Sequence, residues 1–136
     1  MTRYAVDTSV AVPLLASNHP AYQQILDWSL GKDLCFSGHA LAETYSVLTR
    51  LPGNLRVAPN DVVHLLESNF MDPVLPKPQT ATGLPALLAP LGIQGGGIWD
   101  ALVGLAAVDN GLPLATRDAR AIPTYDALGV VTEVLG

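Results

Sequence analysis

The stretch YAVDTSV at residues 4–10 passes from a short apolar segment to a cluster of helix-capping residues. Tyr4–Val6 has the apolar character of a buried strand, whereas Asp7, Thr8 and Ser9 carry side chains that cap helix amino termini. We therefore expect a strand that ends at Val6 and a helix that begins near Val10. Strand-to-helix units of this kind build parallel sheets covered by helices on both faces.

The rest of the chain continues this alternation. Further strands are expected at residues 34–37, 112–116 and 130–134, with a weaker one at 71–75, and helices at residues 20–30, 40–50, 59–70, 80–91 and 98–110. Glycine and proline stand at most of the boundaries between these segments. The sequence contains no repeat and no long linker. It therefore predicts one α/β domain over residues 1–136, with a parallel sheet between two helical layers.

Composition excludes several classes of protein. Of the 136 residues, 49% are hydrophobic and 14% are charged, which is too apolar for a disordered tail and indicates a self-associating surface. The apolar runs are shorter than the roughly 20 residues of a membrane span, so we expect no membrane contact. The net charge of −5 argues against a general nucleic-acid binder. Any nucleic-acid role must be local and assisted by a cation.

Two features favour a cytoplasmic location. Asp7 comes so early that it leaves no room for the apolar core of a signal peptide. Cys35 is the only cysteine, so the chain can form no internal disulfide, as is usual for proteins of a reducing compartment. We expect a cytoplasmic protein.

Four acidic residues are predicted to share one edge of the sheet. Asp7 follows the first strand and Asp118 follows the strand at 112–116, while Glu43 and Asp100 lie in the first turns of helices. In parallel sheets the strands' carboxyl ends and the amino ends of the following helices meet at one edge, where ligands bind. We expect the four carboxylates to converge there.

Each acid taken alone has a simpler interpretation. Asp7 and Asp118 could be cap or turn residues, and Glu43 and Asp100 could be favourable partners of helix dipoles. Taken together the four favour a site, because Glu43 and Asp100 stand among apolar neighbours. Those neighbours are unusual for solvated helix faces.

Converging carboxylates require a cation. Two of them about 4 Å apart repel by roughly 4 kcal/mol at an effective dielectric of about 20. An all-oxygen ligand set selects Mg²⁺, with Mn²⁺ as a substitute. Such an ion can polarise a phosphoryl oxygen and activate water for phosphodiester cleavage. Ser9 and Thr116 could orient water or a carboxylate. The three histidines lack a zinc-like spacing.

Two arginines next to the last acid have two interpretations. Arg117 and Arg120 flank Asp118 and could bind an RNA phosphate. Arginines near a turn are also commonly just solvated. The sequence leaves both interpretations open.

The acids lie in motifs that resemble those of the PIN-domain ribonucleases, and more closely the VapC-type toxins of toxin–antitoxin pairs. The resemblance runs through DTSV at residues 7–10, LAET at 41–44, WDAL at 99–102 and TRD at 116–118, in that order. Residues 46–52 and 125–130 also resemble this branch. One departure is Ala119, which stands where some relatives have another polar residue and weakens the case for a second metal.

The resemblance implies a three-layer fold with a five-stranded parallel sheet and one or two magnesium ions held by Asp7, Glu43, Asp100 and Asp118. It also implies RNA as substrate, inhibition of translation by RNA cleavage, a cognate antitoxin protein that blocks the site, and a homodimer.

Two alternatives from other classes stay open. A phosphoacceptor signalling domain also gathers acids and magnesium at a sheet edge, with Asp7 or Asp118 as acceptor, but no suitable lysine partner is evident. A noncatalytic RNA- or protein-binding module could keep the same fold, although the complete acidic set would then be unexplained.

Overall fold

Five parallel strands form one sheet in the computed structural model, which describes residues 2–136. In space the strands follow the order β3-β2-β1-β4-β5, with the bounds β1 (Thr2–Val6), β2 (Lys32–Ser37), β3 (Met71–Val74), β4 (Leu114–Thr116) and β5 (Thr132–Val134). The central strand β1 pairs with β2 from Thr2↔Lys32 to Val6↔Phe36 and with β4 at Val6↔Ala115. The predicted parallel α/β sheet is confirmed, and Asp7 leaves its central strand.

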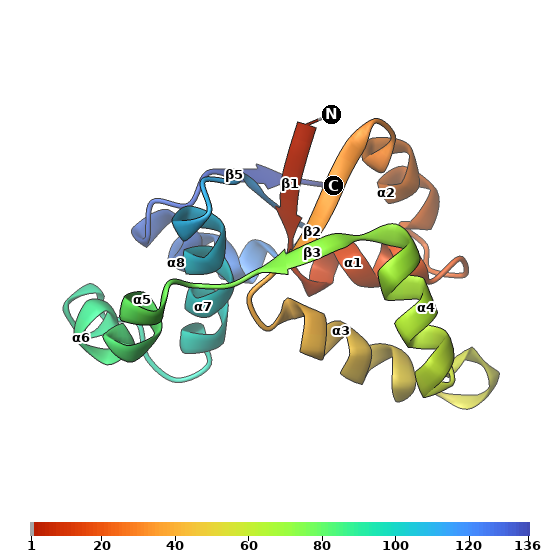
Figure 1. Ribbon diagram of the computed structural model, residues 1–136, viewed down its shortest axis with the longest axis horizontal. Helices are drawn as coiled ribbons and strands as arrows, with labels where there is room; N and C mark the ends of the chain where they lie inside the picture. Colours follow the sequence, from red (N-terminus) through yellow and green to blue (C-terminus); the bar gives the residue numbers. More distant parts are fainter. Residues whose placement is uncertain (1) are drawn as a thin grey trace.

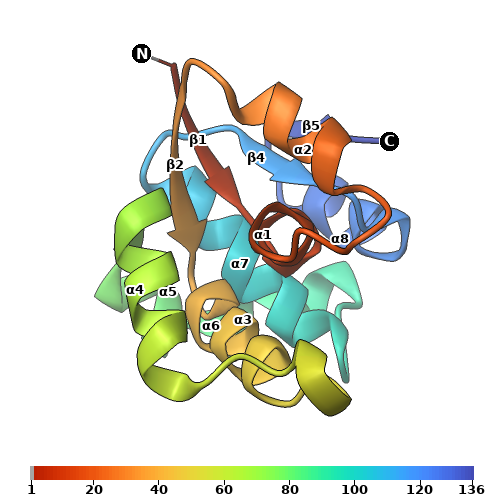
Figure 2. The ribbon, with the colours of Figure 1, turned by 90° about the vertical axis from the view of Figure 1, so that its right-hand side faces the viewer.

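Helices lie on both sides of the strands. In Figure 1, α1 to α4 lie to the right of β1 and α5 to α8 to its left. In Figure 2 the arrowheads of β1 and β2 point toward the side of the sheet where α1 and α3 begin. The helix bounds are α1 (Thr8–Leu15), α2 (Tyr22–Ser29), α3 (Ala40–Thr49), α4 (Pro59–Asn69), α5 (Pro78–Thr82), α6 (Leu84–Leu88), α7 (Gly97–Asp109) and α8 (Ile122–Ala127), with short 3-10 turns η1 (Gly53–Leu55), η2 (Ala89–Leu91) and η3 (Ala119–Ala121).

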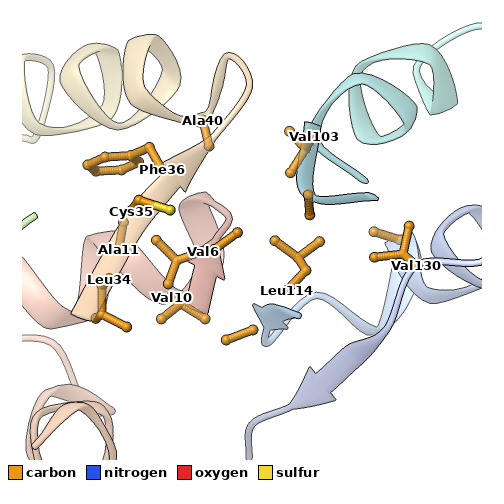
Figure 3. Packing of buried hydrophobic residues seen from close by; sticks show 14 of the residues in the cluster. Val6, Val10, Ala11, Leu34, Cys35, Phe36, Ala40, Val103, Leu114 and Val130 are labelled. Atoms are coloured by element: carbon orange, nitrogen blue, oxygen red, sulfur yellow. The ribbon is translucent and has the colours of Figure 1, made fainter. Parts of the chain in front are cut away.

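The main core lies between the sheet and its helices. Figure 3 shows Val6 of β1 and Leu114 of β4 near Val10 of α1 and Val103 of α7. All four side chains are at most 4% exposed. Cys35 belongs to the same cluster and is fully buried, as its apolar neighbours in the sequence indicate. Burial of this apolar surface is the main favourable contribution to folding. It also holds the carboxyl ends of β1 and β4 side by side.

The end of β2 is locked against α7. The buried Ser37 hydroxyl donates to the Val103 carbonyl at 2.6 Å. Gly38 follows with φ +57°, and a Cβ there would lie 3.1 Å from the Leu102 carbonyl oxygen. A residue with a side chain would be both strained and crowded at this position. The close approach brings the starts of α3 and α7 together, and with them Glu43 and Asp100.

Several local expectations were wrong. Residues 80–91 do not form one helix, because the chain breaks after α5 at Gly83 and restarts at α6, which has Pro85 near its start. The helix expected from residue 20 begins at Tyr22, since a turn with the His19 ring as acceptor for the Ala21 N–H precedes it. The helix α8 was not predicted at all.

None of the helices described in residues 2–136 is both long and apolar enough to cross a membrane.

Candidate active site

All four predicted acids line one small cavity at the carboxyl edge of the sheet. The cavity has a volume of about 80 Å³. Asp7 directly follows β1, Asp118 lies just beyond β4, and Glu43 and Asp100 lie in the first turns of α3 and α7. The remaining lining residues are Thr8, Ser9, His39, Trp99, Val103, Arg120 and Tyr125. Segments far apart in the chain therefore meet in one acidic pocket.

Asp7 is the most buried of the four acids, with 6% of its surface exposed. It caps α1, and its Oδ1 accepts from the Ser9 backbone N–H at 3.1 Å and from the Ser9 hydroxyl at 2.5 Å. Its Oδ2 accepts from the Thr116 hydroxyl at 2.5 Å and from the Tyr125 hydroxyl at 3.0 Å. The predicted supporting residues Ser9 and Thr116 thus both contact Asp7. Their donors fix the orientation of its carboxylate.

The charge of Asp7 is not neutralised by these neighbours. Burial raises the pKa of the Asp7 carboxyl above its ordinary value, while hydrogen bonds from Ser9, Thr116 and Tyr125 act in the opposite direction. All three donors are uncharged hydroxyls. A cation in the cavity would therefore be favourable beside Asp7.

Tyr125 is the site residue that the sequence did not reveal. It lies in α8 and is 1% exposed. Burial, and then the negative charge of Asp7, raise its pKa far above the ordinary value, so the hydroxyl remains a protonated donor. The ring reaches Asp7 past Gly104, where a Cβ would lie 3.0 Å from Tyr125 Cδ1. The resemblance of residues 125–130 to the toxin branch was the only sequence signal for it.

The opposite side of the cavity is more open. Glu43 is exposed and accepts a hydrogen bond from the Thr8 hydroxyl. Its apolar sequence neighbours were interpreted as unusual for a solvated helix face, but Ala42 and Tyr45 are exposed as well. Asp100 is partly buried, with 18% of its side chain exposed. Burial raises the pKa of Asp100. The positive charge of Arg120 acts to lower this pKa, and the negative charges of Asp118 and Glu43 act to raise it further.

Arg120 joins two of the acids. Its guanidinium lies 3.3 Å from Asp100 Oδ2 and 2.9 Å from Asp118 Oδ2, and 71% of its side chain is exposed. The charges of Asp100 and Asp118 raise the pKa of Arg120. Arg117 does not line the cavity; its guanidinium approaches the Ser9 carbonyl at 3.5 Å, and its backbone N–H donates to the Ser9 hydroxyl. Of the two arginines, Arg120 is the one that lines the cavity.

The chemistry of the donor set fits a hydrated hard cation better than a closed cage. No group of three or more His, Cys, Asp or Glu side chains within residues 2–136 is arranged to hold a metal ion. Magnesium usually takes one or two carboxylates and keeps several waters. The lining offers carboxylate and hydroxyl oxygens, and a guanidinium already occupies a cation position between Asp100 and Asp118. The residues present therefore fit a largely water-bound magnesium ion.

Comparison with known proteins gives concordant relatives. The chain is 52% identical over 126 residues to "Ribonuclease VapC27" of Mycobacterium tuberculosis, covering 93% of this chain and 92% of the relative. It is 38% identical over 132 residues to "Ribonuclease VapC40" of the same species, covering 96% of this chain and 98% of the relative. Among solved structures it resembles VapBC2 of Rickettsia felis, crystallised with a promoter DNA fragment, with a TM-score of 0.69, 14% identity and coverage of 99% and 100%.

Residues 4–127 match the PIN domain family, and this stretch includes all four acids. Because the match extends over most of the sequence and the ribonuclease relatives cover nearly the whole chain, the protein belongs to the PIN domain family.

Proposed function

We propose that this protein is a metal-dependent ribonuclease that hydrolyses RNA phosphodiester bonds and acts as the toxin of a toxin–antitoxin pair, inhibiting translation. The observation that carries the proposal is the convergence of Asp7, Glu43, Asp100 and Asp118 on one cavity. The relatives named as ribonucleases support RNA as the substrate.

Mg²⁺ is the proposed cofactor, with Mn²⁺ as a substitute, and the four acids would hold it either directly or through the waters that the ion keeps. When bound, the ion polarises a phosphoryl oxygen and lowers the pKa of a bound water. The lining offers four carboxylates and several hydroxyls, with one histidine and no cysteine, which supports a hard cation over zinc, because zinc prefers nitrogen and sulfur ligands.

Other residues of the cavity would orient the acids, bind the substrate and limit access of water. Ser9, Thr116 and Tyr125 hold the Asp7 carboxylate in one orientation, and Thr8 does the same for Glu43. Arg120 is exposed and lies between two acids, so it would turn to an RNA phosphate once a metal neutralises those acids. Val103 and Tyr125 form the buried apolar floor that limits water around Asp7.

Partners follow from the surface and from the resemblance to VapC-type toxins. The structure exposes large apolar side chains such as Leu30, Leu75 and Val131, each at least 64% exposed. We propose that a homodimer contact and a cognate antitoxin cover part of this surface, and that the protein acts in the cytoplasm.

The two other classes are less well supported. A phosphoacceptor needs an accessible carboxylate, but Asp7 is only 6% exposed and Asp118 is paired with Arg120. Neither Lys32 nor Lys77 lines the cavity. A noncatalytic module would bind RNA or a protein without cleaving RNA. Such a module would not require a buried carboxylate like that of Asp7, held in place by hydroxyl groups.

Cleavage of RNA under metal titration tests the proposal. Purified protein should cut RNA with Mg²⁺ or Mn²⁺ and stop when EDTA is added. Asp7→Asn and Asp100→Asn should each lower the cleavage rate more than about a hundredfold, because loss of a ligand exceeds the 10- to 100-fold cost of losing an outer-shell partner. Sequencing of RNA ends would also show whether the cuts are discrete.

Asp61→Asn is the matched control. Asp61 lies in the first turn of α4, as Asp100 does in α7, but it is outside the cavity. This variant should cleave normally. Full cleavage by both Asp7→Asn and Asp100→Asn, with folded circular dichroism spectra, would defeat the nuclease assignment.

A further inference from the structure

Trp99 combines an exposed ring with a position at the acidic cavity. It is 60% exposed, although it precedes Asp100 and lines the same cavity. Single exposed apolar residues are ordinary on protein surfaces. Trp99 is unusual among exposed apolar residues because it lines the acidic cavity. The other large apolar residues of that lining, Val103 and Tyr125, are buried.

A second ring holds the indole. His39 lies just before α3 and meets Trp99 edge to face, with ring centroids 5.7 Å apart and an interplanar angle of 75°. The His39 Nδ1 atom is buried, with no hydrogen-bond partner in the part of the chain that the structure describes. The ring contact is the interaction that the structure shows between His39 and Trp99. An indole held on one side and open on the other can accept a flat ligand.

We propose that Trp99, supported by His39, is a stacking platform for a nucleobase next to the RNA phosphate bound in the cavity. The assignment rests on the proposed ribonuclease function. Base–aromatic stacking is strong and tolerates any base, since every base has a π face. Trp99 lines the same cavity as Asp100 and Arg120, so a base on the indole keeps its own phosphate near the acids and the guanidinium.

A single exposed ring suits a base better than a protein surface. A stable protein contact covers roughly 800 Å² on each partner and has an apolar centre. Here the residues around Trp99 in the cavity lining are mostly acids and hydroxyls. A nucleotide needs one aromatic face and one charged neighbour, which Trp99 and the Arg120 guanidinium provide.

The indole N–H resonances give a direct test. The chain has two tryptophans, and Trp28 packs against Tyr4 and Lys32 outside the cavity, so it serves as an internal control. AMP carries a base and a phosphate but no phosphodiester bond, so the enzyme cannot cleave it. With Mg²⁺ present, AMP should shift the Trp99 resonance and leave that of Trp28 unchanged. Ribose 5-phosphate should shift neither, and Trp28→Phe assigns the two signals.

Steady-state cleavage gives the second test. Trp99→Ala should raise the KM for RNA by roughly 5- to 100-fold and change kcat much less, because it removes binding by stacking. Trp99→Phe keeps an aromatic face and should restore most of the affinity. Tyr45→Ala is the control, since Tyr45 is another aromatic residue, is 39% exposed and lies outside the cavity.

The outcomes separate the platform from the nuclease. Equal Trp99 shifts with AMP and ribose 5-phosphate, or an unchanged KM in Trp99→Ala, would overturn the platform. An unchanged KM together with weaker binding of a protein partner would reassign the ring to that partner. If the protein cleaves no RNA, the nuclease proposal fails, and the AMP experiment still decides whether Trp99 stacks a base.

Discussion

Asp7 and Asp118 occupy equivalent places in the fold but have opposite surroundings. Each follows one of two neighbouring parallel strands, and each caps the next helical segment through a backbone N–H two residues on, at 3.1 Å. Asp7 is 6% exposed and accepts from three uncharged hydroxyls. The Asp118 side chain is 29% exposed and pairs with a guanidinium. The carboxylate of Asp7 is therefore held in one orientation without a positively charged partner. The carboxylate of Asp118 has such a partner, Arg120, on the exposed side of the cavity.

The difference separates two tasks. Neutral donors align Asp7 without reducing its charge, so its attraction for a metal is retained. Arg120 lowers the repulsion between Asp100 and Asp118 and is largely exposed, as its proposed role toward an RNA phosphate requires. Two acids at equivalent capping positions thus differ in their surroundings: hydroxyl groups orient Asp7, and a guanidinium balances the charge of Asp118.

The largest effect that would sharpen this comparison is expected from Tyr125→Phe. The change removes one donor to Asp7 and should lower the affinity for Mg²⁺ or the cleavage rate by about 10- to 100-fold. It should also cost about 1 to 3 kcal/mol of unfolding free energy. Calorimetric titration with Mg²⁺ and urea unfolding measure the two effects.

Tyr45→Phe is the control for that variant. Tyr45 is 39% exposed and lies outside the cavity, so both quantities should stay at the wild-type values. If Tyr125→Phe both binds Mg²⁺ as tightly and cleaves RNA as fast as the wild type, the hydroxyl does not align Asp7 for a metal.

A second effect concerns pH in the metal-free protein. Burial raises the folded-state pKa of Asp7 above its unfolded value, so the unfolded chain loses this proton first as pH rises. The free energy of unfolding should therefore fall between the ordinary Asp pKa and the higher folded one. Asp7→Asn removes this contribution, and its stability relative to the wild type should increase over that interval. Urea unfolding in EDTA at a series of pH values measures the difference.

Two controls bound the pH experiment. Asn54→Ala should follow the wild-type pH dependence, because Asn54 is exposed and carries no titratable group. Added Mg²⁺ should stabilise the wild type more than Asp7→Asn, since a ligand that binds only the folded state raises its stability. A constant offset between wild type and Asp7→Asn at every pH would contradict the buried, uncompensated charge.

The smallest effect is expected from Arg120→Gln. Exposed ion pairs contribute about 0.2 to 1 kcal/mol to stability, so the free energy of unfolding should fall by an amount in that range. Removing the competing cation should strengthen Mg²⁺ binding a few-fold, while RNA binding weakens. Arg50→Gln, at the exposed end of α3, should alter neither. Weaker Mg²⁺ binding in Arg120→Gln would mean that the guanidinium supports the metal site and does not compete with it.

Local patterns predicted much of the fold and part of the site. The strand before Asp7 was found from its apolar residues and the capping residues that follow it, and the helices that carry Glu43 and Asp100 were found from their apolar residues. The helix α8 was missed because its six residues include Pro123, Thr124 and Asp126 and show no clear apolar period. The break at Gly83 was missed because one glycine within a helical pattern is often tolerated.

The sequence by itself determined which residues stand at strand ends and in first helical turns, and parallel pairing then brings the four acids to one edge. Only the tertiary structure decided what surrounds each acid. Tyr125 reaches Asp7 across 118 positions of chain, Arg120 spans Asp100 and Asp118, and His39 holds Trp99. The physical reason is that these contacts depend on how closely helices pack on the sheet, at glycines such as Gly38 and Gly104, and no local pattern of residues records that packing.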